Sequence, residues 1–145
     1  MTPKNSDYSE SALVERPAMD LFSQLGWSVQ NCFHEFDESG LGFLGRETKV
    51  DVVLISKLKH SLKKINPDIS ETVIDEAIKI FTSDRSLMGM VSANREVFDL
   101  LKNGVLVSYL DNKNENVSDR VKIIDWVNTE NNDFFLASQF WISGL

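Results

Sequence analysis

The chain contains a single cysteine, Cys32, and no long run of apolar residues. One cysteine excludes both an intramolecular disulfide and a four-cysteine zinc site. The longest clean apolar run is VVLI, residues 52–55, whereas a membrane-spanning helix needs roughly 20 such residues. The first residues, MTPKNSDYSES, are polar and contain no recognisable signal peptide. These absences predict a cytoplasmic protein without a membrane segment.

Basic charge is also scarce. The 145 residues include 15 Lys and Arg against 22 Asp and Glu, which gives a net charge of −7. A general nucleic-acid-binding protein usually has a basic surface, so this balance argues against one. It still allows a DNA enzyme whose basic groove lies elsewhere in a larger chain. The length and the 42% apolar content predict one globular domain over residues 1–145.

Helical periodicity is strongest in the first part of the chain. Residues 8–25 place apolar side chains on one side, although Pro17 is expected to kink or restart that helix. Residues 47–65 repeat apolar positions at steps of three and four and predict the cleanest helix. Asp68 begins a capping-box pattern that opens the next helix. A further helix is expected over residues 92–102.

The character changes near residue 105, where β-branched and aromatic residues accumulate. VLVSYL (105–110), DRVKIIDWV (119–127) and DFFLASQFWI (133–142) predict strands separated by polar turns. Alternating apolar residues suggest one more short strand at residues 27–33. A meander is the simplest pairing of the last three strands. Helices followed by a run of strands predict an α+β, or mixed α/β, fold.

The stretch ESGLGFLGRET places Gly40, Gly42 and Gly45 in the spacing G-x-G-x-x-G. A dinucleotide site needs an apolar strand that runs directly into the first glycine, and a second strand after the helix. Here the preceding residues, HEFDES, are polar, and the predicted helix leads into another helix. The glycines are therefore expected to serve a flexible connection.

Several other groups of residues invite a functional interpretation. In KLKHSLKK, Lys57, His60 and Lys64 share one helix face, which predicts either phosphate contacts or an ordinary solvated surface. Lys59 and Lys63 form a neighbouring row on the same helix.

His34, Glu35 and Asp37 do not match a known set of metal ligands, so a surface loop is expected there. Cys32 has no local partner that would activate it and is expected to be a small buried side chain. Core packing is the expected role of the aromatic residues near the C-terminus, Trp126, Phe134, Phe135, Phe140 and Trp141.

Longer stretches show a family resemblance. LGRETKVDVVLISKLKHSLKKINPDI, AIKIFTSDRSLMGMVSANREVFDLLKNGV and VKIIDWVNTENNDFFLASQFWISG occur in this order. They resemble a Gly-Arg-Glu entry to a helix, an Asn-Pro helix break, an Ala-Asn-Arg-Glu helix and an Ile-Asp-Trp strand of type I restriction enzyme R subunits. The resemblance covers the chain from about Ser9 to its last residue, and it implies that the glycine spacing is a coincidence.

The resemblance implies that this is the N-terminal part of a nuclease domain with a partial restriction-endonuclease-like core. In the family an aspartate and a Glu-x-Lys strand follow the segment that resembles NDFFLASQFWISG, and they bind the divalent ion that activates water. We expect this fragment to end before those catalytic strands and to be inactive alone. The full-length bacterial or archaeal protein is expected to need Mg²⁺ and ATP. Its expected partners are double-stranded DNA and the specificity and methylation subunits.

Two glutamates remain as candidates within these residues. The family carries a glutamate on its first helix near the metal site, and Glu15 matches it by its distance from Gly26 and Trp27, with Glu10 as the rival. The alternative is a non-catalytic docking module, for which the helical insertion at 47–102 would supply the surface. The apolar segment FLASQFWISGL is also expected to leave an open strand edge through which the chain self-associates.

Overall fold

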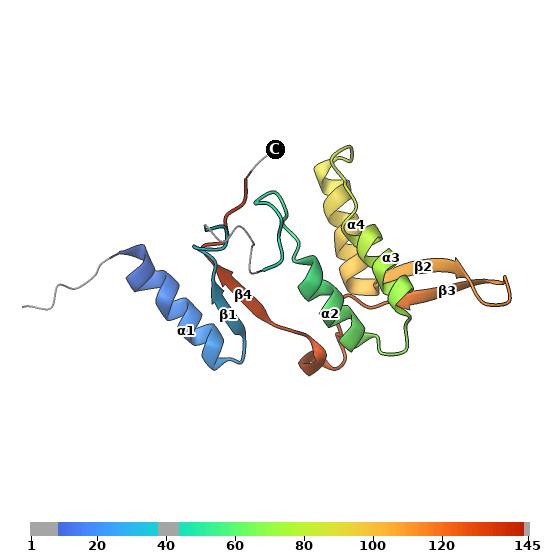
Figure 1. Cartoon of the computed structure of the whole chain (residues 1–145), viewed down its shortest axis with the longest axis horizontal. Helices are drawn as coiled ribbons and strands as arrows, with labels where there is room; N and C mark the ends of the chain where they lie inside the picture. The colour runs from blue at the N-terminus through green and yellow to red at the C-terminus, as the bar shows by residue number, and fades with distance from the viewer. Residues whose placement is uncertain (1–8, 38–43, 144–145) are drawn as a thin grey trace, which may run out of the picture. The chain divides into compact units, whose positions relative to one another are not determined.

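The computed structural model describes residues 9–37 and 44–143, and the chain divides into two compact units. Unit 1 combines Met1–Val52 with Asp133–Leu145, and unit 2 is Val53–Asn132. Each unit contains helix and strand (Figure 1). The mixed α+β composition is thus confirmed, whereas a single domain stays a prediction.

Unit 1 begins with a π-helical turn, Ser11–Glu15, followed by α1, Arg16–Gln24. Pro17 lies in the first turn of α1, where a missing backbone N–H costs no hydrogen bond. The helix therefore changes from π to α next to this proline, while the chain stays helical through the change. Helix α1 is amphipathic, but none of its described side chains is fully buried, so the predicted apolar side of residues 8–25 is only partly covered.

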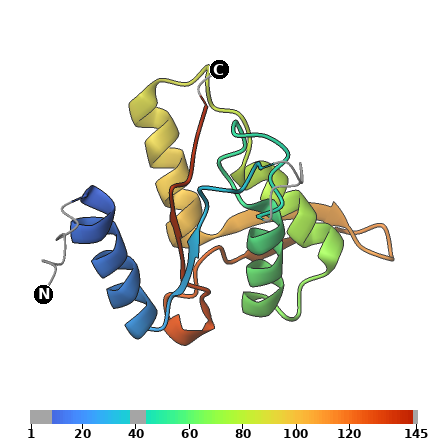
Figure 2. The same cartoon turned by 60° about the vertical axis from the view of Figure 1, so that its left-hand side comes forward.

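The sheet of unit 1 pairs two segments from opposite ends of the chain. β1, Ser28–Asn31, runs parallel to β4, Phe135–Ser138, and α1 runs beside this pair (Figure 2). The Trp27 ring joins the three elements, because it packs 4.9 Å from the ring of Phe22 and 5.1 Å from that of Phe134. Because β1 and β4 are parallel, their C-terminal ends lie at the same end of the sheet.

The predicted meander is wrong. β2, Val105–Leu110, and β3, Asn116–Val121, form an antiparallel hairpin, but the third predicted strand pairs with β1. After β3 the chain enters a hydrogen-bonded turn that includes the 3₁₀ segment Thr129–Asn131. That turn separates β3 from β4 along the chain, and the strand predicted at 119–127 ends early, at Val121.

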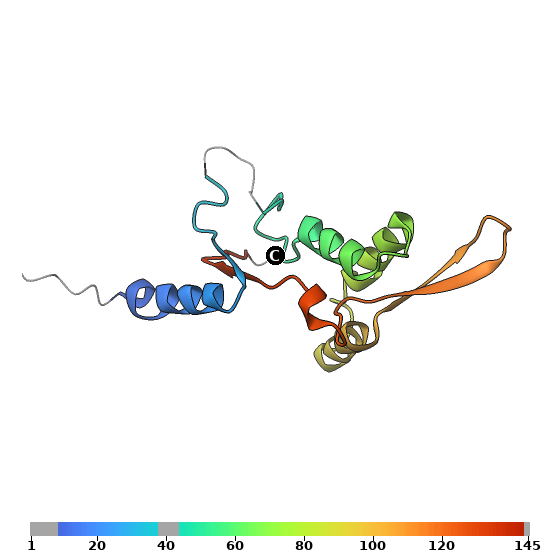
Figure 3. The same cartoon turned by 90° about the horizontal axis from the view of Figure 1, so that it is seen from below.

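Unit 2 contains three helices and the hairpin: α2, Ile55–Ile65; α3, Glu71–Phe81; and α4, Met90–Asn103. Its buried core comes from α2, α3 and the inner face of the hairpin, which Figure 3 shows as a long twisted ribbon. The predicted buried positions Ile74, Ala77 and Ile78 are confirmed. No helix of the residues described here is long and apolar enough to cross a membrane.

Two predicted helix starts are wrong. Helix α2 begins at Ile55 instead of residue 47. The Asp51 carboxylate accepts hydrogen bonds from the backbone N–H groups of Glu47 and Thr48, at 3.1 and 2.8 Å, and such side-chain contacts favour a turn over a helix. Helix α3 is capped by Ser70, whose hydroxyl oxygen accepts from the N–H of Val73, and not by Asp68.

Candidate functional site

Glu15 lies at the end of the π-helical turn of unit 1 and faces the residue that follows β4. The side-chain nitrogen of Gln139 lies 3.0 Å from each oxygen of the Glu15 carboxylate. Glu10, Val14, Glu15 and Gln139 together line an open hollow of about 250 Å³. Glu10 and Glu15, the two glutamates predicted from the sequence, therefore line the same hollow, next to the residue that follows β4.

The backbone at the end of β4 is unusual. Gln139 has φ 53°, a left-handed conformation that a non-glycine residue adopts uncommonly and at a cost. The preceding residue, Ser138, has a solvent-shielded hydroxyl oxygen with no hydrogen-bond partner in the part of the chain that the structure describes. A strained backbone persists only where the surrounding contacts fix it, and such residues are common at functional sites.

A buried ion pair that no pattern of the sequence indicates lies beside the chain that leaves β4. Arg46 is 4% exposed and Glu35 is 2% exposed. The guanidinium group of Arg46 donates from Nε to one oxygen of Glu35, at 2.9 Å, and from Nη2 to the other. This two-point contact raises the pKa of Arg46, chiefly through its hydrogen bond with Glu35. The residues are 11 positions apart across a loop, a separation that gives no periodic signal.

Arg46 also contacts the chain that leaves β4. Its Nη1 donates to the backbone oxygens of Asp51 and Trp141, at 3.0 and 3.1 Å. Its guanidinium carbon lies 3.8 Å from the centre of the Phe140 ring, within the range of a cation–π contact. The Gly-Arg-Glu motif thus places its arginine in a structural clamp, with Gly45 before it at φ 76°. Gly40 and Gly42 lie outside the described residues.

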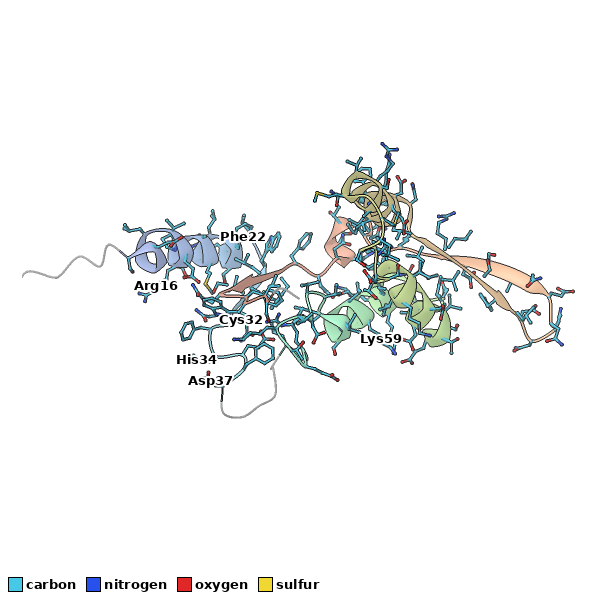
Figure 4. The ribbon with its side chains drawn as sticks, turned by 90° about the horizontal axis from the view of Figure 1, so that it is seen from above. Arg16, Phe22, Cys32, His34, Asp37 and Lys59 are labelled. Atoms are coloured by element: carbon cyan, nitrogen blue, oxygen red, sulfur yellow. The ribbon has the colours of Figure 1, made fainter. Side chains whose placement is uncertain are left out.

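The surface loop predicted after β1 is correct for His34 and Asp37 but wrong for Glu35, which is buried. His34 and Asp37 form an exposed pair at 2.6 Å, drawn in Figure 4, while Glu35 turns inward to Arg46. The described residues contain no group of three or more His, Cys, Asp or Glu that could hold a metal ion. The Glu15 carboxylate is a suitable oxygen ligand for Mg²⁺, but it does not form a complete site with the other described residues.

The basic cluster belongs to unit 2, whereas Glu15 belongs to unit 1. Lys57 and Lys64 are exposed on α2. The neighbouring row faces α3: Lys59 contacts Glu71 at 2.9 Å and Asp75 at 2.6 Å, and Lys63 also contacts Glu71. Lys59, and then Lys63, lower the pKa of Glu71 to about 2. The row of Lys59 and Lys63 therefore joins α2 to α3.

Three further expectations have mixed outcomes. Cys32 is buried, as predicted. Core packing is wrong for Trp126, Phe134 and Trp141, which are exposed to solvent. The Ile-Asp-Trp motif is not a strand, because Asp125 is buried in a turn and accepts hydrogen bonds from the backbone N–H groups of Val127 and Asn128. The indole nitrogen of Trp126 donates to a backbone oxygen at the end of α4, 3.1 Å away.

Comparison with known proteins identifies the class to which this region belongs. The sequence model of the family described as Type I restriction enzyme R protein N terminus matches residues 7–145. The chain therefore belongs to this family of restriction-modification proteins. No solved structure matches it significantly.

Two curated relatives show the same relationship. The chain is 26% identical over 133 residues to the type I restriction enzyme HindI endonuclease subunit of Haemophilus influenzae, across 89% of this chain and 12% of that protein. It is 26% identical over 147 residues to a Methanocaldococcus jannaschii protein named as a candidate type I restriction enzyme MjaIXP endonuclease subunit, across 97% of this chain and 13% of that protein. The chain thus spans about an eighth of either relative.

Proposed function

We propose that this region builds the N-terminal part of the nuclease domain of a type I restriction R subunit. Its role is that of a scaffold: it contributes the first helix and the β1–β4 pair of a restriction-endonuclease-like core. The aspartate and the Glu-x-Lys strand expected from the family would follow β4. The whole protein would then cleave double-stranded DNA with Mg²⁺, coupled to ATP-driven translocation, together with specificity and methylation subunits.

The observation that carries this proposal is the contact between Glu15 and Gln139. A helical carboxylate reaches the end of a parallel strand, which is the place where the family's metal-binding residues would begin. Parallel strands collect functional side chains at their carboxyl ends. Glu10 lines the same hollow, so it remains the rival for the helical carboxylate.

The test is DNA cleavage by the full natural chain, assembled with its partner subunits and supplied with ATP and Mg²⁺. Glu15→Gln removes the charge and keeps the shape of the side chain. It should lower cleavage by roughly 10- to 100-fold, the range for residues that support a metal site. The matched control is Asp20→Asn on an exposed part of α1, which should cleave like the wild type. Equal cleavage by Glu15→Gln and the wild type would remove Glu15 from the site.

A docking module is the second candidate, and one feature of unit 2 favours it. Leu87, Met90, Val91 and Phe98 are 101%, 80%, 72% and 60% exposed. The last three lie on α4, where a contiguous exposed apolar patch would mark an interaction surface. The double substitution Val91→Ser and Phe98→Ser should then prevent assembly with the partner subunits. Docking becomes the leading function if that double variant fails to assemble while Glu15→Gln cleaves normally.

A further inference from the structure

We propose that Arg46 is a positioning residue, which fixes the path of the chain beyond β4 and thereby holds Gln139 against Glu15. This inference rests on the proposed nuclease function and deepens it. Arg46 itself does not line the hollow beside Glu15. It acts through the five residues that follow β4, residues 139–143.

These residues are held at successive points. The Gln139 side chain contacts Glu15, the Phe140 ring lies against the Arg46 guanidinium group, and the Trp141 carbonyl accepts a hydrogen bond from Arg46. The N–H of Ser143 then donates to the backbone oxygen of Lys49, at 3.1 Å, in the same loop as Arg46. The exit from β4 is thus attached both to the first helix and to the Arg46 loop.

An arginine suits this position better than any other residue. Its planar guanidinium group donates two hydrogen bonds to Glu35 and two more to backbone oxygens. The same group also makes a cation–π contact with the ring of Phe140. A lysine has one ammonium group and cannot reproduce this arrangement. The Glu35 carboxylate neutralises the positive charge of Arg46, whose burial without a counter-charge would cost free energy.

Fold stability alone does not explain the clamp. A buried ion pair is often no more stabilising than apolar residues of similar size, so an apolar contact could have held the same loop. The contacts of Arg46 instead adjoin a residue with strained backbone, Gln139 at φ 53°. Such strain persists only where the surroundings over-determine it, and it is common at functional sites. The contacts of Arg46 therefore fix the direction in which the chain leaves β4.

The experiment compares wild type, Arg46→Lys and the control Arg95→Lys in the full natural chain with its partner subunits. Arg95 is exposed on α4 of unit 2. The first readout is hydrogen–deuterium exchange of residues 139–143, which reports the attachment directly and needs no activity. The second is DNA cleavage at saturating Mg²⁺ and ATP.

Arg46→Lys should accelerate exchange of residues 139–143 while leaving α3 protected, and it should lower the cleavage rate about 100-fold, the cost of a small misplacement. Phe140→Leu, which keeps the Arg46–Glu35 pair, should produce smaller changes in the same direction and serves if Arg46→Lys fails to fold. Arg95→Lys should match the wild type in both readouts.

Unchanged exchange in Arg46→Lys and Phe140→Leu would overturn the inference, and so would faster exchange with wild-type cleavage. Failure of the proposed function has a different signature: the wild-type assembly itself would not cleave, although the exchange difference persists. The positioning role would then fall together with the nuclease function.

Discussion

The side-chain nitrogen of Gln139 donates to both oxygens of the Glu15 carboxylate, at 3.0 Å each, although the two residues are 124 positions apart in the sequence. The pairing of β1 with β4 is what brings these two side chains together. Gln139 makes the contact from a left-handed backbone at φ 53°. The geometry of the proposed site therefore depends on the conformation of the chain just beyond β4.

Substitutions at Gln139 separate the side-chain contact from the backbone strain. Gln139→Ala and Gln139→Gly both lose the bond to Glu15, but only glycine adopts a positive φ without steric cost. Gln139→Gly should therefore have a free energy of unfolding about 1 kcal/mol higher than Gln139→Ala. Urea denaturation of both variants measures this difference. Equal stabilities would show that no strain is stored at this position.

Asn66 offers a prediction about the Asn-Pro break after α2. Its side chain donates to the backbone oxygen of Lys122 and accepts from the N–H of the same residue, both at 2.9 Å. Asn66→Ala leaves two backbone groups of Lys122 without this partner, so the free energy of unfolding should fall by about 1–3 kcal/mol. Asn94→Ala, at an exposed position of α4, should change it little. A loss no larger than that of the control would contradict the structural role of Asn66.

Local patterns predicted the elements of this fold better than their pairing. The stripe of Ile74, Ala77 and Ile78 has helical spacing, so its burial in α3 followed directly from the sequence. The pairing of β1 with β4 did not, because neither strand encodes a partner more than 100 residues away. The meander expectation failed for this reason.

The same limit applies to the site. The family resemblance points to Glu15, with Glu10 as the rival, whereas nothing in the sequence indicates that Arg46 pairs with Glu35. Glu35 looks like part of a polar loop in HEFDES, and only the folded chain shows that it is buried. An arginine immediately after Gly45 in a polar loop was the one available signal, and it does not specify a partner.

Asp125 should make the stability of unit 2 depend on acid pH. The backbone N–H of Asn128, followed by the side chain of Asn131, lowers the pKa of its buried carboxyl below the usual 3.8. A carboxyl group whose pKa is lowered in the folded state stabilises the folded state fully at pH values above its pKa in the unfolded chain. This stabilisation is lost as the pH falls toward the pKa of the folded state. Wild-type stability should therefore decline more steeply below pH 3.8 than that of Asp125→Asn.

Unfolding measured by circular dichroism across this pH range tests the prediction for Asp125. The control is Asp99→Asn, at an exposed position of α4, which should retain the wild-type pH dependence. Parallel curves for the wild type and Asp125→Asn would contradict the proposed role of this carboxylate.

Lys57 and Lys64 should contribute to DNA binding if α2 contacts phosphates. Replacing both with Gln should weaken binding similarly for all DNA sequences and reduce the slope of log K against log salt by about 2, since each phosphate contact contributes nearly one unit. Lys79→Gln with Lys102→Gln removes the same charge from α3 and α4 and should preserve the slope. Identical slopes for the two double variants would exclude a specific phosphate contact by α2.

The most direct test of the central claim is cleavage of a DNA substrate by the full natural chain and its partner subunits, with ATP hydrolysis measured in the same reaction. We predict that Glu15→Gln lowers cleavage strongly and leaves ATP hydrolysis unchanged, while Glu10→Gln has a much smaller effect on cleavage. Wild-type cleavage by Glu15→Gln would contradict the account, because the helical carboxylate that contacts Gln139 would then have no part in the nuclease site.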